Sequence, residues 1–340
     1  MLNRIRTLLT HKIYDLPIVV LMPHSSCNCR CVMCDIWKAN HNKKEITAEQ
    51  LEKHLEAFRG ARVREVVLSG GEALLHSNLW TLCEQLRKLK IKITLLSTGL
   101  LLERYRDKIL AYIDNVIVSV DGSPEVHDAI RNIPNGYAKI SSGIRALREL
   151  DPSFRITARC VLQKRNYRDF INIVMSAKSI GLDQISFLAA DVSSTAFNHT
   201  DENTSIKVRD IIMDESEIRE FESIIERSFT EHPDFYDSRF IAERPGKMKS
   251  IVQYYKALIG LGDYPHVLCN APWVSTVIES DGSVLPCFFH KPLGNIHDDN
   301  LMNILNSPRA ISWRKNLNME RDATCRKCVC TLKLGVTQLS

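Results

Sequence analysis

Three cysteines near the start of the chain have the spacing of an iron–sulfur site. Cys27, Cys31 and Cys34 form a C-x3-C-x2-C run. A cube of four irons needs four outer ligands, and thiolates are the usual ones. Three protein thiolates leave one iron open to a substrate or cofactor, as in catalytic metal sites. The run therefore predicts a reactive cluster rather than a structural one.

Two other interpretations fit the same run. It could be half of a zinc site, although no second Cys or His pair follows soon after Cys34. It could hold a disulfide, although its cysteines are crowded and we find no secretory signal. Cys29, inside the run, does not match the C-x3-C-x2-C spacing, so we expect it to be a bystander.

The cysteine count supports metal binding elsewhere in the chain as well. The 340 residues include eleven cysteines. All but Cys83 and Cys160 fall in two groups, at positions 27, 29, 31, 34 and 269, 287, 325, 328, 330. Without a secretory signal, such clustering predicts metal sites in a cytoplasmic protein.

The overall composition is ordinary for a globular protein. Hydrophobic residues make up 44% and charged residues 25% of the chain, and the net charge is +5. No Lys/Arg block is dense enough to predict nucleic-acid binding. No apolar stretch approaches the ~20 residues of a membrane span. The weakly amphipathic segment Met1–His11 could contact a membrane, but a short helix capping the domain fits it better.

Short apolar runs alternate with helical patterns in the first half of the chain. The expected strands are Ile18–Met22, Glu65–Ser69, Ile91–Ser97, Val116–Val120, Arg155–Leu162 and Gln184–Ala189. The expected helices are Thr47–Phe58, Trp80–Leu89, Leu101–Ala111, Ala138–Leu150 and Phe170–Ile180. Thr47 and Gln50 have the spacing of a capping box. The alternation predicts an α/β fold with a parallel sheet, open or rolled into a barrel.

Four loops with chemically suggestive residues follow the ends of strands. The cysteine loop follows the first strand, Gly70-Gly71-Glu72 the second, Thr98-Gly99 the third and Asp121-Gly122 the fourth. Chemistry in such folds lies at the carboxyl ends of the strands. We therefore expect these loops to meet at one rim.

The pattern changes after Ala190. Residues 191–263 contain a polar stretch, Asp191–Arg209, and two helical patterns, Glu215–Phe229 and Lys247–Leu261. In residues 264–340, Asp281-Gly282 predicts a hairpin between Thr276–Ile278 and Val284–Pro286. A helix follows from Leu301 to Leu305 or on to Leu317. We expect three parts, residues 1–190, 191–263 and 264–340.

The ordered motifs resemble those of radical S-adenosylmethionine (radical SAM) enzymes with a C-terminal SPASM/twitch-type module. The cysteine run is joined by Ser69-Gly70-Gly71-Glu72, Ser97-Thr98-Gly99 and Ser119-Val120-Asp121-Gly122, with His127-Asp128 and Arg131 following. The resemblance covers the chain from about Ile18 to Cys330. It implies a partial (β/α)6 TIM-type barrel with a small cysteine-rich α+β (twitch) module.

The resemblance also implies the cofactors and the reaction type. Cys27, Cys31 and Cys34 would hold a [4Fe–4S] cluster whose fourth iron binds S-adenosylmethionine. A one-electron donor of the flavodoxin or ferredoxin type would reduce the cluster. Cleavage of the cofactor would give a 5′-deoxyadenosyl radical that abstracts hydrogen from the substrate.

Further residues are assigned to the cofactor by the same resemblance. Gly70 and Gly71 would let the backbone approach the methionyl amino group. Glu72 completes that motif, although Ala73 stands where the family usually has proline. The remaining cofactor candidates are Thr98, Ser119 and Arg131, the last as a partner of the methionyl carboxylate. The family often has an aromatic residue before the third cysteine, where this chain has Met33. Asp121-Gly122 could instead only make a turn, and His127 and Asp128 could only cap a helix.

The fifth expected strand separates polar from apolar side chains. Thr157 and Arg159 share the face of Arg155 and Val161, and Cys160 lies on the other face. We expect the polar face to point into the barrel, which makes Thr157 and Arg159 candidates for substrate contact. Cys160 is expected only to pack, as is Cys83 within its helix.

The C-terminal cysteines resemble the twitch signature. In such modules Cys269, Cys287, Cys325 and Cys328 would bind one auxiliary [4Fe–4S] cluster. Cys330 is the spare, and it could replace Cys328 or be free. A zinc site with four cysteines is the competing interpretation.

Three functions remain open from the sequence. In the first, the substrate is a small polar metabolite that is oxidised or rearranged with help from the auxiliary cluster. In the second, it is a ribosomally made peptide that receives a thioether or carbon–carbon crosslink or is epimerised. Since only 26 residues precede Cys27, too few for a peptide-binding domain, the first is preferred. The third is a non-catalytic metal-binding scaffold or redox sensor.

Overall fold

A curved, open sheet forms the framework of the molecule. The computed structural model describes residues 2–199 and 208–338, and within them the strand order is β6-β5-β4-β3-β2-β1-β7-β8-β9. The strands are β1 (Ile18–Leu21), β2 (Glu65–Leu68), β3 (Lys92–Ser97), β4 (Asn115–Ser119), β5 (Arg155–Leu162), β6 (Gln184–Ala189), β7 (Ser275–Ile278), β8 (Ser283–Leu285) and β9 (Gly294–Asn295). Strands β1 to β6 are parallel neighbours in chain order. Because β6 and β9 are both edges, the sheet is a partial barrel, which confirms the predicted fold class.

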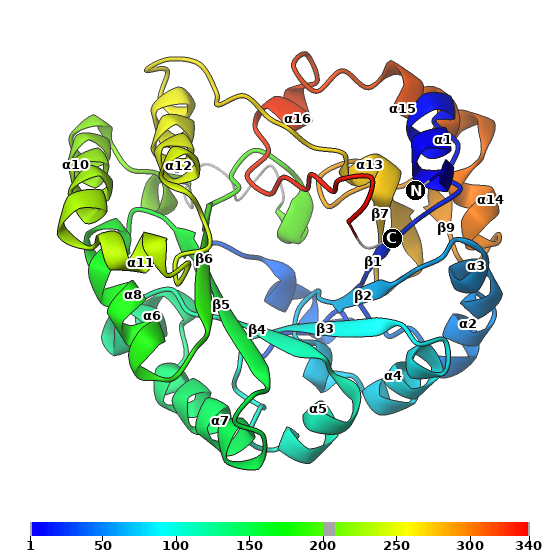
Figure 1. Ribbon diagram of the computed structural model, residues 1–340, viewed down its shortest axis with the longest axis horizontal. Helices are drawn as coiled ribbons and strands as arrows, with labels where there is room; N and C mark the ends of the chain where they lie inside the picture. Colours follow the sequence, from blue (N-terminus) through cyan, green and yellow to red (C-terminus); the bar gives the residue numbers. More distant parts are fainter. Residues whose placement is uncertain (1, 200–207, 339–340) are drawn as a thin grey trace.

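Helices cover the convex side of the sheet (Figure 1). They are α2 (Ala48–Glu52), α3 (Leu55–Gly60), α4 (Leu79–Lys88), α5 (Arg106–Tyr112), α6 (Pro124–Arg131), α7 (Gly136–Leu150) and α8 (Phe170–Ser179). Apolar side chains on the outer face of the sheet pack against this layer. In β5, Ala158 and Cys160 are buried in that core, whereas Arg159 and Val161 face inward. The alternation predicted for this strand is therefore confirmed.

Two expected helices differ from the structure. The pattern Thr47–Phe58 contains two helices, α2 and α3, although Thr47 and Gln50 do form the capping box. The break falls at His54, whose ring Nε2 lies 3.0 Å from the carbonyl of Ile296 in the C-terminal part. The helix expected from Leu101 begins only at Arg106, because residues 101–105 form turns.

Residues 208–263 add a helical layer beyond β6. They include α10 (Glu215–Glu231) and α12 (Pro245–Leu258), close to the two expected helices, and the short helix α11 (Pro233–Asp237), which the sequence did not predict. The hydroxyls of Tyr254 and Tyr255 on α12 donate to the carbonyls of Ala190 and Leu162, at the ends of β6 and β5. Of the polar stretch Asp191–Arg209, residues 200–207 lie outside the described residues.

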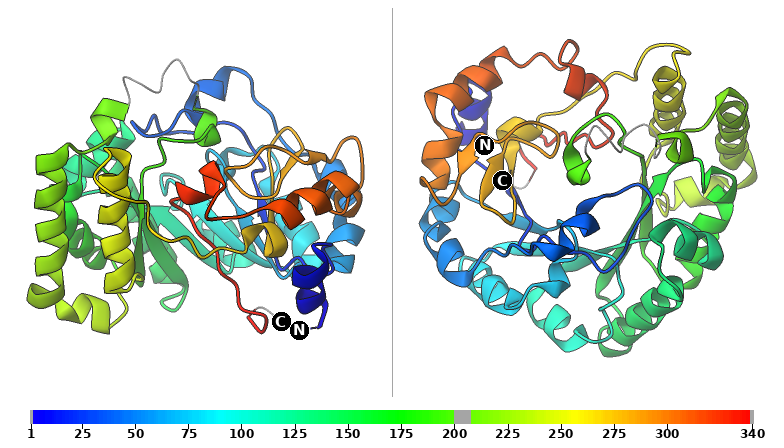
Figure 2. Two further views of the ribbon diagram at one scale, coloured as in Figure 1. Left: turned by 90° about the horizontal axis from the view of Figure 1, so that it is seen from above. Right: turned by 180° about the vertical axis from the view of Figure 1, so that it is seen from behind.

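The C-terminal part continues the sheet past β1. After α13 (Ala271–Val274), β7 pairs with β1 in parallel, and β8 pairs antiparallel with β7 as the expected hairpin. Gly282 has φ +84°, which suits the turn. The helical pattern from Leu301 is two helices, α14 (Leu301–Leu305) and α15 (Pro308–Asn316), followed by α16 (Ala323–Arg326). These segments lie across the open side of the curved sheet (Figure 2).

The N-terminal helix α1 (Leu2–Thr10) packs against this C-terminal part. Asn306 exchanges two hydrogen bonds with the backbone of Ile13, and Arg314 donates to the carbonyl of His11. The expectation of a short capping helix therefore fits the structure.

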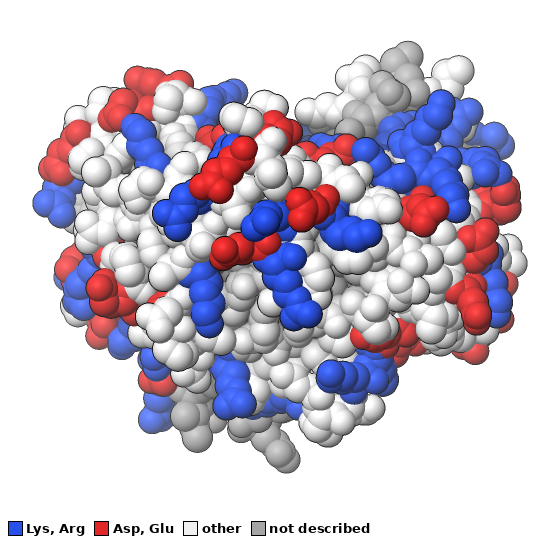
Figure 3. All heavy atoms as spheres, turned by 90° about the horizontal axis from the view of Figure 1, so that it is seen from below, with Lys and Arg blue, Asp and Glu red and all other residues white. Residues whose placement is uncertain are grey.

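The described residues include no helix that combines the length and apolarity needed to cross a membrane. Basic and acidic side chains are interspersed over most of the face seen in Figure 3.

Candidate radical SAM site and auxiliary cluster site

The three cysteines of the first run line one cavity. Cys27, Cys31 and Cys34 lie on the loop after β1, at a cavity of about 230 Å³ inside the carboxyl ends of the strands. The predicted residues on the same wall are Gly70, Gly71, Thr98, Ser119, Arg131, Met33 and Arg159. Cys29 is buried and lies off this wall. The structure thus brings together the loops that the sequence predicts to meet at one rim.

Hydrogen bonds from three sides hold the cysteine loop. The side-chain amide of Asn40 bonds both the N–H and the carbonyl of Cys27, each at 2.9 Å. The N–H groups of Arg30 and Val32 donate to the backbone at the end of α6. The hydroxyl of Thr98, which also bonds Glu72, lies 2.9 Å from the side-chain amide of Asn28. The loop is therefore positioned before any ligand binds.

Gly71 is required by the packing of the loops. A Cβ on Gly71 would lie 2.2 Å from the carbonyl oxygen of Ser26 and 3.2 Å from Cβ of Cys27. The next N–H, of Glu72, donates to that same carbonyl at 2.9 Å. From the sequence we expected Gly71 to lack a Cβ so that the cofactor could approach the backbone. In the structure, the missing Cβ first allows the loop after β2 to contact the cysteine loop.

Glu72 lies beneath the cavity rather than on its wall. Its carboxylate accepts from the N–H of Leu74 at 3.1 Å, the hydroxyl of Ser97 at 2.9 Å, and the N–H and hydroxyl of Thr98 at 2.7 and 2.6 Å. Complete burial outweighs these donors and raises the pKa of Glu72. The carboxylate joins the loop after β2 to the loop after β3, which is a positioning role.

Arg131 is already engaged by residues of this chain. Its guanidinium lies 2.5 Å from the carboxylate of Asp121 and donates to Sγ of Cys31 at 3.5 Å. Burial opposes its charge, but Asp121 and the nearby thiols raise the pKa of Arg131. A methionyl carboxylate at Arg131 would have to share it with Asp121.

The three thiols differ in how readily they ionise. A hydrogen bond from Cys29, together with Arg131, outweighs burial and lowers the pKa of Cys31 to about 6. Burial raises the pKa of Cys27 and that of Cys34 to about 12. Cys29 and Arg131 therefore both favour the thiolate form of Cys31, the form in which cysteine binds metals.

A second cavity, of about 280 Å³, contains the C-terminal cysteines. It is lined by Cys269, Cys287, Cys325, Cys328 and Cys330, together with His290. The two cavities adjoin, because both are lined by Leu96, Arg159, Phe288, Phe289 and Cys330. Thr157, the other substrate candidate, lies on neither wall.

Family models match both halves of this site. The radical SAM superfamily model matches residues 21–177, and the model of the SPASM iron–sulfur cluster-binding domain matches residues 269–329. The chain belongs to the radical SAM superfamily. The prediction of a radical SAM enzyme with a SPASM/twitch-type module is therefore confirmed.

This radical SAM enzyme resembles proteins that are named for peptide biosynthesis. The antilisterial bacteriocin subtilosin biosynthesis protein AlbA of Bacillus subtilis is 24% identical over 83% of this chain and 58% of AlbA. The sporulation killing factor maturation protein SkfB of the same organism is 22% identical over 93% of this chain and 69% of SkfB. The chain thus spans less than two thirds of AlbA.

Solved structures share the fold. Streptococcus suis SuiB bound to precursor peptide SuiA has a TM-score of 0.67 at 15% identity, over 96% of this chain and 73% of that chain. SuiB has also been solved bound to S-adenosylmethionine.

The cofactors follow from the two domains. The protein uses S-adenosylmethionine with a [4Fe–4S] cluster and carries auxiliary iron–sulfur binding in its C-terminal domain. The donor sets fit both groups, because the three thiols of the first run line the first cavity and five thiols line the second, with Cys330 on the wall that they share.

Sequence reasoning missed two residues beside the auxiliary site. His290 and Asp322 lie next to Cys325, and the three ligand atoms are all within 4.8 Å of one another. The available signal was local: His290 follows Cys287 by three residues, and Asp322 precedes Cys325 by three, the spacing of a helix N-cap.

Proposed function

We propose that this radical SAM enzyme modifies a ribosomally made peptide, by a thioether or carbon–carbon crosslink or by epimerisation. The observation that carries the proposal is a set of three adjoining cavities, all lined in part by Phe288. An outer cavity of about 270 Å³ shares Gly70, Gly71, Phe197 and Phe288 with the cavity of the first cysteines. That cavity in turn adjoins the one with the C-terminal cysteines.

An extended peptide suits this arrangement better than a compact metabolite. The outer cavity carries His41, Lys44 and Asp281, which offer charged and polar partners to a peptide chain. The first cavity is lined mostly by apolar side chains, including Leu188, Phe288 and Phe289. A peptide that extends from the outer cavity into the first would reach the wall shared by the two cluster sites.

The relatives favour the same substrate class. Two are named for making a bacteriocin and a sporulation killing factor, and SuiB was solved with a precursor peptide. The preference for a small metabolite rested on the short segment before Cys27. Relatives that are named for small molecules, a pre-heme d1 synthase and several probable GTP 3′,8-cyclases, match only 28–52% of this chain, against 83% and 93% for AlbA and SkfB. A non-catalytic scaffold is not retained, because the chain is a radical SAM enzyme.

Within this proposal, Cys27, Cys31 and Cys34 hold the cluster that binds S-adenosylmethionine. When both are bound, the cluster and S-adenosylmethionine would together supply a 5′-deoxyadenosyl radical that abstracts hydrogen from the substrate. Gly70, Gly71, Thr98 and Ser119 face the cofactor from the strand ends. Arg131 orients Cys31 through its N–H donor, and Glu72 holds the loops that carry these residues.

The auxiliary cluster is held by Cys269, Cys287, Cys325 and Cys328. Cys330 is the spare because it lies on the wall shared by both cavities, whereas Cys325 and Cys328 line only the second. Arg159 also lies on the shared wall and offers a cation to a substrate carboxylate. An acidic flavodoxin- or ferredoxin-type donor would supply the electron.

The cofactor chemistry is tested by anaerobic reconstitution. We expect about eight irons per chain, from two four-iron clusters, and 5′-deoxyadenosine after dithionite reduction. Cys27→Ala should abolish nucleoside formation, whereas Cys83→Ala, buried within α4 away from both cavities, should retain it. Iron without nucleoside would refute the proposal.

The substrate class is tested by coexpression. The enzyme is produced with each short peptide encoded beside its gene, and peptide masses and deuterium uptake from D2O are compared with those from the Cys27→Ala variant. A Cys27-dependent loss of two hydrogens indicates a crosslink, and deuterium uptake at unchanged connectivity indicates epimerisation. Unmodified peptides, alongside turnover of a small metabolite, would overturn the peptide assignment.

A further inference from the structure

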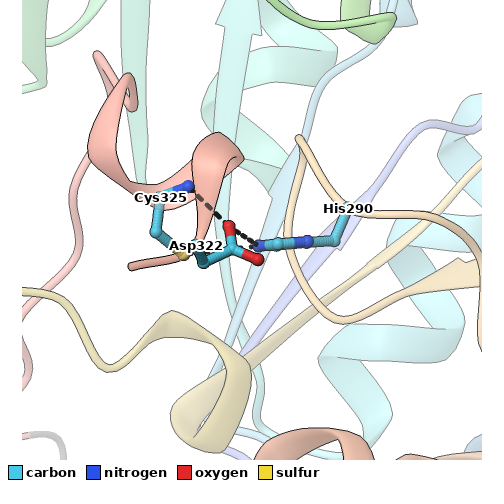
Figure 4. Close-up of side chains that lie close together, drawn as sticks. All are labelled: His290, Asp322 and Cys325. Carbon is cyan, nitrogen blue, oxygen red and sulfur yellow. Dashed lines mark hydrogen bonds and ion pairs between the residues drawn. The ribbon is translucent and has the colours of Figure 1, made fainter. Parts of the chain in front are cut away.

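The imidazole of His290 reaches a cysteine of the auxiliary site. Its Nε2 lies 3.4 Å from Sγ of Cys325 and 3.7 Å from a carboxylate oxygen of Asp322. Figure 4 shows the ring of His290 pointing edge-on toward the other two side chains, with Asp322 drawn between His290 and Cys325. Because a metal-bound thiolate has no proton to give, a hydrogen bond between this pair must run from Nε2–H to sulfur.

The protein holds the ring in this orientation. The His290 side chain is only 10% exposed. It packs against Trp313 of α15 in a T-shaped arrangement, with ring centroids 4.9 Å apart. His290 also follows Cys287 by three residues, and both line the second cavity. One short segment therefore carries a proposed ligand of the auxiliary cluster and the ring that reaches a second one.

Asp322 brings a negative charge to the same sulfur. Its carboxylate caps α16 by accepting from the N–H of Cys325 at 2.8 Å, so the helix start depends on it. An anion beside a cluster ligand disfavours addition of an electron to the cluster. The N–H of His290 is the polar group placed to offset it.

We propose that His290 donates its Nε2–H to the Cys325 thiolate and thereby raises the reduction potential of the auxiliary cluster. Hydrogen bonds to the sulfurs and the net local charge are among the properties that set the potentials of iron–sulfur clusters. His290 is thus a positioning residue rather than an iron ligand. A higher potential makes the cluster a better acceptor of the electron that a substrate radical releases. The inference rests on the proposed ligation by Cys325.

The test is an EPR-monitored redox titration of the reconstituted full-length protein. The auxiliary signal is the one that does not respond to added S-adenosylmethionine. His290→Leu, which removes the donor, should shift its midpoint to more negative potential. His290→Gln keeps an N–H donor and should stay closer to the wild type. His266→Leu, at an exposed histidine that does not line the second cavity, is the matched control and should leave the midpoint unchanged.

A second variant should shift the midpoint potential in the opposite direction, and it leaves the ring of His290 in place. Asp322→Asn retains a good helix cap but removes the charge, so the midpoint should move to more positive potential. An unshifted midpoint in His290→Leu would overturn the role of His290. So would a directly bonded nitrogen in the 14N hyperfine spectrum of the wild type, because His290 would then be a ligand.

Failure of the underlying ligand assignment has a different signature. Cys325→Ala should lose the auxiliary signal while the S-adenosylmethionine-responsive signal remains. If the auxiliary signal persists in that variant, the ligation by Cys325 is wrong, and the inference falls with it. If the signal is lost but His290→Leu is unshifted, only the role of His290 is wrong.

Discussion

Glu72 joins two loops of the site through four hydrogen bonds, so its charge-neutral replacement should be costly. In Glu72→Gln, an amide NH2 replaces one accepting oxygen opposite N–H or hydroxyl donors. We expect a loss of about 1–3 kcal/mol in the free energy of unfolding, measured by urea denaturation. Glu84→Gln, at an exposed pair with Lys88, should stay within about 0.5 kcal/mol of the wild type. Equal stability of the two variants would contradict this role.

His127 makes the stability of the fold depend on pH. The ring is buried and accepts from the N–H of Asp121 at 3.2 Å. Burial, and then Arg131, lower the pKa of His127 to about 4. Because the folded pKa lies below the unfolded one, this contribution is complete above about pH 6.5 and is lost as the pH falls toward 4. The loss amounts to roughly 3 kcal/mol, at ~1.4 kcal/mol per pKa unit.

The measurement is urea unfolding of the metal-free protein at pH 7 and pH 4.5. His127→Asn keeps an acceptor for Asp121 without a titrating ring, so its stability should fall less over this interval. A pH dependence as steep as that of the wild type would assign the effect to other groups.

At the scale of elements, β5 separates a functional from a structural face. Arg159 faces the wall shared by both cavities, with its Nε 3.5 Å from Oγ of Ser186. Arg159→Gln should therefore raise the KM for the substrate at least tenfold, equivalent to about 1.4 kcal/mol, while 5′-deoxyadenosine formation without substrate persists. Arg155→Gln, at the exposed start of the same strand, should leave KM unchanged. An unaltered KM in Arg159→Gln would remove Arg159 from the substrate site.

Most strands and the cysteine loop could be predicted because their signals are local. Apolar runs ending at Gly70-Gly71-Glu72 or Thr98-Gly99 already show where parallel strands end. The break between α2 and α3 could not be predicted, since His54 finds its partner Ile296 only in the folded chain. The contact between His290 and Asp322, and the ion pair between Arg131 and Asp121, could not be predicted for the same reason. The assignments of individual ligands, and the three-part division of the chain, remain predictions.

For the whole molecule, Arg4 ties the two ends of the chain together. Its guanidinium pairs with Asp15 at 2.9 Å and donates to the carbonyls of Gly335 and Gln338. Arg4→Met should cost about 3 kcal/mol, as is typical when one partner of a buried pair is removed. It should also speed proteolysis near residue 335. Arg6→Met, at an exposed side chain over Tyr14, is the control and should cost no more than about 1 kcal/mol. Equal losses in the two variants would show that Arg4 does not tie these ends.

The place of β1 between β2 and β7 limits how early the sheet can be completed during synthesis. One edge of β1 is filled by residues 275–278, which leave the ribosome long after Ile18. At about 5–20 residues per second, that edge waits on the order of 10 to 50 s for its partner. Until then β1 has an unpaired edge, and an unpaired apolar strand edge favours aggregation. Phe288, Phe289 and Cys330, which lie on the wall shared by the two cavities, are synthesised later still, so neither cluster can be enclosed before translation is nearly finished.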